Sequence, residues 1–158
     1  MKKLLCVLLV MLMTLTICSC GAKSLLDARE ALESKGYYVT AASLSEFMPT
    51  DIEGKVLAAF DKDGIDKEQY SEWEDDIDEA LYQTKNFVYA IYLESEQDAK
   101  ELYPDIEEVC ESCREYFEEM AEDELEAIAD GVVFKDISCQ MQGNVIYWGT
   151  KNAIKIAK

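Results

Sequence analysis

Histidine is absent from the 158-residue chain. Histidine is the side chain that most often serves as a general base, and it pairs with the nucleophile in Ser-His and Cys-His catalysis. It is also the commonest metal ligand. The sequence contains no nucleophile elbow, phosphate-binding loop or dinucleotide-binding fingerprint. We therefore expect a protein that is not an enzyme, with no catalytic residues, no cofactor and no bound metal.

Positive charge is also scarce. The chain has 15 Lys and Arg residues against 33 Asp and Glu residues, which gives a net charge of −18 at pH 7. A protein this acidic is repelled by phosphate groups, so nucleic acid is excluded as a partner. The same repulsion excludes electrostatic docking on anionic lipid, which requires clusters of basic residues.

A hydrophobic run opens the chain, MKKLLCVLLVMLMTLTICSC. Lys2 and Lys3 precede an apolar stretch over 4–17, which is too short to span a bilayer comfortably and is typical of a secretory signal peptide. The run ends in Ile17-Cys18-Ser19-Cys20-Gly21. This ending resembles the lipobox of bacterial lipoproteins, in which an aliphatic, a variable and a small residue precede a cysteine. The resemblance implies cleavage before Cys20 and acylation of its thiol and of its new amino group.

On this basis we expect residues 1–19 to be a lipoprotein signal peptide and residues 20–24 to be the lipidated cysteine with a short tether. Residues 25–158 would then form a single globular domain, a suitable length for one hydrophobic core. The leader holds two of the 15 basic residues and no acidic residue, so the mature chain would carry a net charge of −20. Its partner at the membrane would be lipid, held through the acyl chains on Cys20.

Apolar periodicity and turn residues predict the secondary structure of this domain. Strands are predicted over 37–42, 55–60, 86–93, 132–141 and 144–148. Helices are predicted over 25–34, 66–85, 105–130 and 151–158, with a further helix that begins at 95 and is kinked or interrupted by the proline at 104. Residues 43–54 are predicted to form a long turn.

Capping residues support several of these boundaries. Ser24 and Ser95 are each followed three residues later by an aspartate, as in a capping box, and Thr150 precedes the last helix. Gly36 is suited to end the first helix in a left-handed conformation.

Strand 86–93 is apolar on both faces, which is typical of a central strand. The order of elements predicts an α+β fold: a mainly antiparallel sheet of about five strands, with the helices mainly on one face and a possible αββα pseudo-repeat.

Three cysteines remain if Cys20 is lipidated: Cys110, Cys113 and Cys139. Cys110 and Cys113 form a C-x-x-C motif, but the motif lies inside a predicted helix and among glutamates, which raise thiol pKa values and disfavour redox activity. We favour packing of these thiols in the core. A structural disulfide with Cys139 and redox chemistry are the alternatives, whereas zinc would lack a fourth ligand.

Acidic and aromatic residues offer further candidate sites. Asp61 and Asp63, with Gly64, fit part of a calcium-binding loop, but Ala59 and Tyr70 occupy its first and closing positions, so an acidic turn is favoured. The acidic run over 107–126 indicates a solvated helix face. Six aromatic residues fall on predicted strands, where core packing is favoured over an exposed patch for a partner: Tyr37, Tyr38, Tyr89, Tyr92, Tyr147 and Trp148.

Together these patterns predict a lipid-anchored lipoprotein on the extracytoplasmic face of the cell membrane, with a non-catalytic binding or scaffolding role. Another envelope protein is a candidate partner. The alternatives are an envelope hydrolase that uses two carboxylates and a calcium-dependent envelope module. A pocket with a strongly raised carboxyl pKa would favour the enzyme, and a flat sheet face with exposed aromatics would favour the binding protein.

The calcium alternative makes a prediction about thermal stability. Because we favour a solvated acidic surface, sodium chloride and calcium chloride at matched ionic strength should raise the melting temperature equally, by screening repulsion within about 10 Å at 0.1 M. Thermal melts check this expectation. A calcium-specific rise that disappears in Asp63→Asn would instead establish a calcium site.

Overall fold

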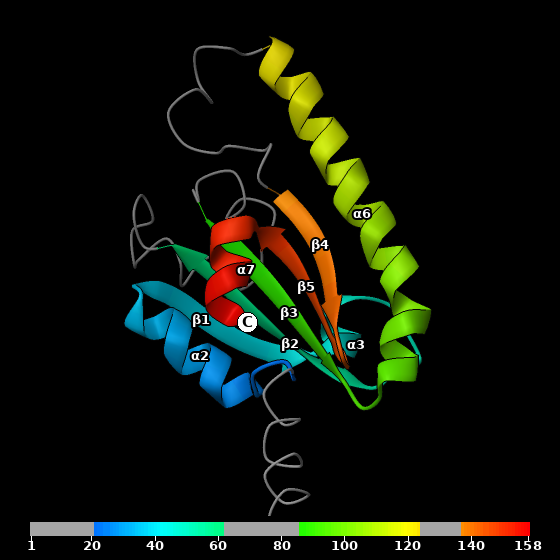
Figure 1. Cartoon of the computed structure of the whole chain (residues 1–158). Helices are drawn as coiled ribbons and strands as arrows, with labels where there is room; N and C mark the ends of the chain where they lie inside the picture. Colours follow the sequence, from blue (N-terminus) through cyan, green and yellow to red (C-terminus); the bar gives the residue numbers. More distant parts are fainter. Residues whose placement is uncertain (1–20, 62–85, 124–136) are drawn as a thin grey trace, which may run out of the picture.

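The computed structural model describes residues 21–61, 86–123 and 137–158, with the backbone alone described for 116–123. Five strands form one sheet in the order β1-β2-β3-β5-β4, and every neighbouring pair is antiparallel (Figure 1). The strands are β1 (Tyr37–Ser43), β2 (Gly54–Asp61), β3 (Phe87–Leu93), β4 (Ile137–Gln142) and β5 (Val145–Thr150). The predicted α+β class with a five-stranded antiparallel sheet is therefore confirmed.

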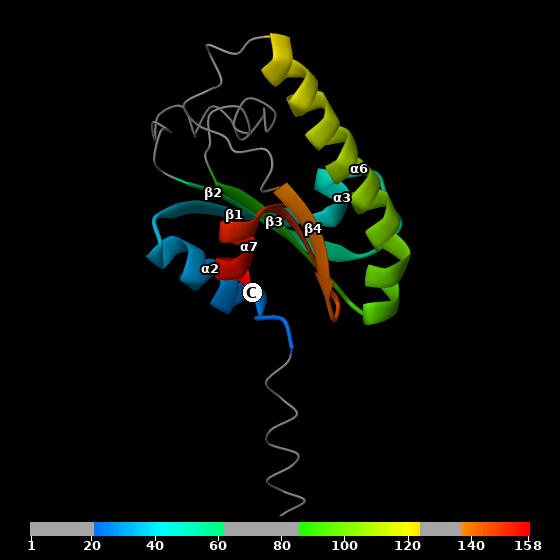
Figure 2. The ribbon, with the colours of Figure 1, turned by 45° about the horizontal axis from the view of Figure 1, so that its top comes forward.

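The helices of the described chain divide between the two faces of the sheet. They are α2 (Leu25–Ser34), α3 (Leu44–Phe47), α6 (Glu96–Asp123) and α7 (Lys151–Ala157). Helices α2 and α7 contribute to the apolar core on one face, whereas α3 and α6 contribute to the core on the other (Figure 2). This arrangement corrects our expectation that the helices would gather mainly on one face.

The reason lies in β3, the central strand. Phe87, Tyr89 and Ile91 point into the core beneath α6, while Val88 and Ala90 point into the core beneath α2 and α7. All five side chains are buried. Because successive residues of a strand face opposite sides, a strand that is apolar at every position needs cover on both. The apolar pattern of the sequence thus correctly predicted a central strand, and burial of both its faces places helices on both sides of the sheet.

Aromatic rings fill the core on the α6 side. The ring of Tyr89 stacks on that of Trp148 with 4.9 Å between centroids, and the ring of Phe47 in α3 lies 5.1 Å from Tyr89 on a tilted plane. Phe60 and Phe87 meet the Tyr89 ring edge-on, at 5.8 and 6.0 Å. Offset and edge-to-face pairs of this kind add to the free energy gained by burial alone. The favoured core position of the strand aromatics is thus confirmed for Tyr89 and Trp148.

Most predicted caps are present. The Ser24 hydroxyl accepts a hydrogen bond from the Asp27 amide at 3.2 Å, and the Ser95 hydroxyl accepts one from the Asp98 amide at 3.1 Å. Gly36 follows α2 with a φ of 88°, as a left-handed glycine should. Thr150 is the N-cap residue of α7, but its side chain makes no capping hydrogen bond. Its hydroxyl lies instead 3.3 Å from the Phe87 carbonyl oxygen and ties α7 to β3.

Two local predictions were wrong. Helix α6 continues through Pro104 without an interruption, so the two helices predicted on either side of this proline are one element. Residues 44–47 form the short helix α3 within the stretch predicted as a turn, because burial of Leu44 between β1 and β2 compensates for the lack of a side-chain cap. The helix predicted over 66–85, the first part of the strand over 132–141 and the end of the helix over 105–130 lie outside the described residues. The pseudo-repeat stays a prediction, because one of its helices is among them.

Gly149 is the glycine on which the sheet depends most. It has a φ of 151° and pairs with Val88 in the middle of the sheet. A Cβ atom there would lie 2.3 Å from the Phe87 carbonyl oxygen and 2.7 Å from the Val88 Cα atom. We expect Gly149→Ala to lower the free energy of unfolding by about 3 kcal/mol, because backbone atoms cannot yield as a flexible side chain can.

Urea denaturation checks this expectation. Gly21→Ala is the control, since a Cβ atom there would have no atom within 4 Å. A Gly149→Ala protein as stable as the control would show that the sheet tolerates a side chain at this position.

Candidate functional site

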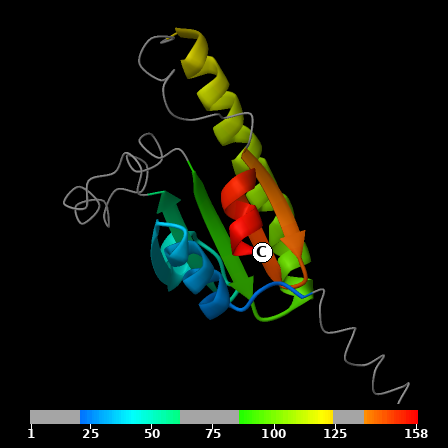
Figure 3. The same ribbon diagram turned by 60° about the vertical axis from the view of Figure 1, so that its left-hand side comes forward.

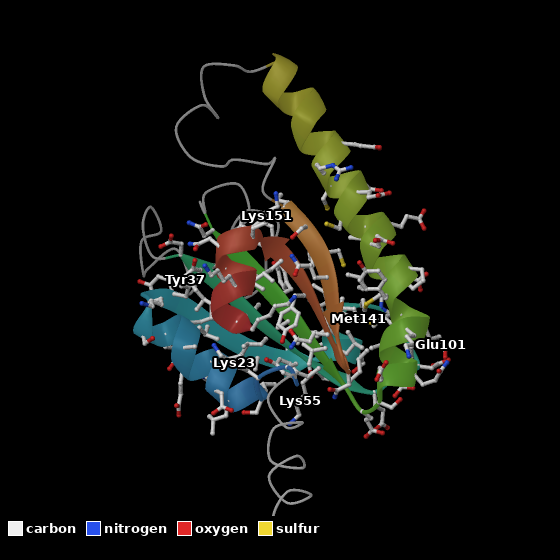
Figure 4. The ribbon with its side chains drawn as sticks, in the orientation of Figure 1. Lys23, Tyr37, Lys55, Glu101, Met141 and Lys151 are labelled. Atoms are coloured by element: carbon white, nitrogen blue, oxygen red, sulfur yellow. The ribbon has the colours of Figure 1, made fainter. Side chains whose placement is uncertain are left out.

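A groove opens at one end of the sheet, with a cavity volume of about 850 Å³. It lies where β1 and β3 end and β2 begins, beside the first turn of α2, and the loop before β2 forms the remaining wall. The first described residues enter the domain at this end, and α6 begins there as well (Figures 1 and 3). In Figure 4 Lys55 marks this end, and Lys151 marks the opposite end of the sheet.

Local hydrogen bonds hold the walls of the groove. The Ser24 hydroxyl both caps α2 and donates to the Asp27 carboxylate at 2.7 Å. The Thr50 hydroxyl accepts a hydrogen bond from the Ile52 amide at 3.1 Å and so turns the loop before β2. The entering chain is held by the Lys23 ammonium, which donates to the Ile156 carbonyl in α7 at 2.8 Å. The walls of the groove are thus held by hydrogen bonds within the domain.

Apolar side chains line the floor of the groove and polar groups its rim. Leu25, Ile52 and Leu93 contribute the floor, and Leu26 stands at the edge with 62% of its surface exposed. The rim carries hydroxyl groups and four charged groups, which are Asp51, Glu53, Glu94 and Lys55. Ligand sites in proteins combine apolar walls with a few polar groups in this way, and cavities of about 300 to 1,000 Å³ are typical.

Two tyrosines with buried hydroxyls belong to the core beneath α2 and α7, and one of them, Tyr92, also lines the groove. The hydroxyl oxygens of Tyr92 and Tyr147 are inaccessible to solvent and have no hydrogen-bond partner among the described residues. Burial raises the pKa of Tyr147 to about 12. Burial also raises the pKa of Tyr92, with further contributions from Tyr147 and Asp27. Both phenols therefore stay protonated at neutral pH, and neither can act there as a general base.

The cysteines lie away from the groove, between α6 and β4. Cys110 belongs to the core, and Cys113 and Cys139 are partly buried against it, which confirms the favoured packing interpretation. Cys110 and Cys139 have free thiols. Burial, followed by the neighbouring Cys113, raises the pKa of Cys110 to about 11. Burial, followed by Cys110, raises the pKa of Cys139 to about 12.

These pKa values agree with the expected direction but not with the expected cause. We attributed the shift to nearby glutamates, whereas loss of solvent is the larger effect for both thiols. A thiolate is the form that attacks disulfides and binds metals. The two thiols are accordingly poor nucleophiles at neutral pH, which is the property expected of structural cysteines.

Other candidate residues from the sequence are only partly placed. Asp61 ends β2 and accepts a hydrogen bond from the Asn86 amide group at 3.1 Å, while Ala59 is buried. Cys20 and the remaining residues of the calcium-type loop, Asp63, Gly64 and Tyr70, lie outside the described residues. Within the described ranges, no group of three His, Cys, Asp or Glu side chains is placed to hold a metal ion.

None of the helices in the described part of the chain is long and apolar enough to cross a membrane. Comparison of the chain with models of protein families, with curated proteins and with solved structures finds no match. The groove must therefore be interpreted from its own chemistry. Sequence analysis did not anticipate it, because its walls come from four separate segments.

The raised thiol pKa values predict slow alkylation. At pH 8 a thiol with a pKa near 11 holds a thiolate fraction more than about 100-fold below that of an ordinary cysteine. We therefore expect iodoacetamide to modify Cys110 and Cys139 at least about 100-fold more slowly in the folded protein than in urea. The folded-state rate should rise about tenfold for each pH unit up to the raised pKa.

Mass spectrometry of digests taken at timed intervals gives the rate at each cysteine. Rapid modification of Cys110 in the folded state at pH 7 would contradict the structural role and favour redox chemistry.

Proposed function

We propose that this chain is a lipoprotein of the bacterial envelope that binds a ligand without catalysis. Cys20 would carry the acyl chains, and the domain that follows would present the groove on the extracytoplasmic side of the membrane. The observation that carries the binding role is the groove itself: a cavity of about 850 Å³ with an apolar floor and a polar rim. The anchoring role depends on the lipobox resemblance at Ile17–Gly21.

The position of the groove supports the combination of the two roles. Ser24, Leu25 and Leu26 line it, and they follow the proposed lipidated cysteine by only four to six residues. A ligand at the outer surface of the membrane would thus meet the groove directly. The fold offers a rigid support there, since β1, β2 and β3 all reach this end of the sheet.

The chemistry of the groove supports binding over hydrolysis. Its three acidic side chains, Asp51, Glu53 and Glu94, are all exposed on the rim. A carboxylic acid that acts in glycoside hydrolysis lies in an apolar pocket that excludes water. The three carboxylates of the groove are open to solvent instead. Exposed carboxylates at the edge of a groove are suited to attract a positively charged ligand.

The anchoring proposal predicts the behaviour of Cys20→Ala. This variant has no thiol to receive the lipid, so we expect its precursor to stay unprocessed and its mature form to be missing from the membrane fraction. Fractionation after labelling with a fatty acid that carries a clickable alkyne measures both quantities.

Cys18→Ala is the matched control, because it removes a neighbouring cysteine and leaves the lipobox cysteine in place. It should be labelled and anchored like the unmodified chain. Lipid labelling that persists in Cys20→Ala would show that the anchor is elsewhere or that the motif is not a lipobox.

A further inference from the structure

We propose that the groove binds a peptide segment in which a large apolar side chain lies next to Lys or Arg. This inference depends on the binding role proposed above and specifies the chemical class of its ligand. It is based on three features of the groove: exposed apolar surface, carboxylates without a counter-ion, and a volume suited to a few side chains.

The apolar surface of the groove is unusual among the residues that the structure describes. Among the described residues, the large hydrophobic side chains that are exposed are Leu26, at 62%, and Val109, at 45%. Val109 lies on α6 outside the groove, whereas Leu26 lines the groove together with the half-buried Leu25 and Ile52. A single exposed leucine needs no explanation, but one that extends an apolar floor offers an incoming side chain a place to be buried.

The charged groups of the groove favour a positively charged ligand. The groove has three acidic lining residues, Asp51, Glu53 and Glu94, and one basic lining residue, Lys55. Its net charge is therefore −2. None of these carboxylates forms an ion pair with a residue of the described chain. The net charge of −18 over the whole chain adds a longer-range attraction for cations. An ammonium or guanidinium group beside the apolar side chain would complete the complementarity.

A peptide fits these features better than a lipid surface. An anionic bilayer would be repelled by the same carboxylates. A peptide provides apolar and cationic side chains on neighbouring residues, and the hydroxyl groups of Ser43, Ser45 and Thr50 on the rim can meet its backbone amides. The Ser43 and Ser45 hydroxyls lie 2.9 Å apart and already share a hydrogen bond, so one remains available as a further donor.

The test uses the full-length protein in neutral dodecyl maltoside micelles and the peptide acetyl-Lys-Leu-Lys-Leu-Lys-amide. Methyl NMR should show shifts at Leu25, Leu26 and Ile52 that saturate with peptide, and the Kd should rise at least fivefold between 0.05 and 0.5 M sodium chloride. The counterpart with Glu in place of Lys should bind at least tenfold more weakly. Equal binding of the two peptides, or no saturable shift at these methyl groups, would overturn the proposal.

Matched variants separate the groove from the general acidity of the chain. Glu53→Gln with Glu94→Gln should raise the Kd at least fivefold. Glu101→Gln with Glu108→Gln makes the same change in net charge on exposed positions of α6 and should change the Kd less than twofold. Likewise Leu26→Ser should weaken binding and Val109→Ser should not. Equal effects of the two glutamate pairs would show non-specific attraction only and would overturn the site.

The outcome is independent of the anchoring test. Peptide binding is measured in micelles, so it does not require that Cys20 be lipidated. Binding at the groove by an unlipidated Cys20→Ala precursor would support both proposals. If the chain is anchored through Cys20 but binds neither peptide, the proposed anchor stands and the ligand proposed here is wrong.

Discussion

The burial of β3 on both faces is the constraint that organises this fold. Its seven residues are all apolar, and six of them are buried. A strand of this kind is stable only as the centre of a sheet with a helical layer on each side. The chain satisfies this need with α2 and α7 on one face and α3 and α6 on the other. Each remaining strand then lies beside β3 or at the second position from it. The connection that contains α6 leads from β3 to the edge strand β4, and β5 returns beside β3.

Local sequence signals predicted the elements well where they were self-contained. The sequence of α2 carries three signals that predict a helix: a capping serine at Ser24, an apolar stripe and a glycine at Gly36 that ends it. The short helix α3 has no such signals, because its N-cap residue Ser43 makes no side-chain capping hydrogen bond and the helix is stabilised by burial of Leu44 in the core on the α6 side. Pro104 was misjudged for a related reason. The effect of a proline on a helix depends on the packing of the flanking turns, and here Leu102 and Ile106 are buried on either side of it.

The candidate site was less predictable than the fold. The groove is assembled from the start of α2, the ends of β1 and β3 and the loop before β2, so no stretch of sequence contains its pattern. Composition correctly indicated acidic surface, but it does not tell which three of 33 acids meet an apolar floor. The cysteines show the opposite case. Their helical spacing alone predicted that Cys110 would face the core, and burial then explains why its thiol has a raised pKa.

An acidic domain that is anchored to a membrane is repelled by anionic lipid. Whether this repulsion matters depends on the length of the tether relative to the Debye length. A net charge of −20 on the mature chain would repel an anionic bilayer, while a lipid on Cys20 would hold the domain close to it. Lys23 and Ser24 are held against the domain, so the free part of the tether is at most residues 20–22. Three residues extend to roughly 10 Å, which is just above the Debye length of about 8 Å at physiological ionic strength. Repulsion is therefore largely screened once the tether is extended. The domain would then stand off from the bilayer and leave the groove open to a ligand in the gap. In that gap the carboxylates of the groove and the anionic membrane surface would both attract cations.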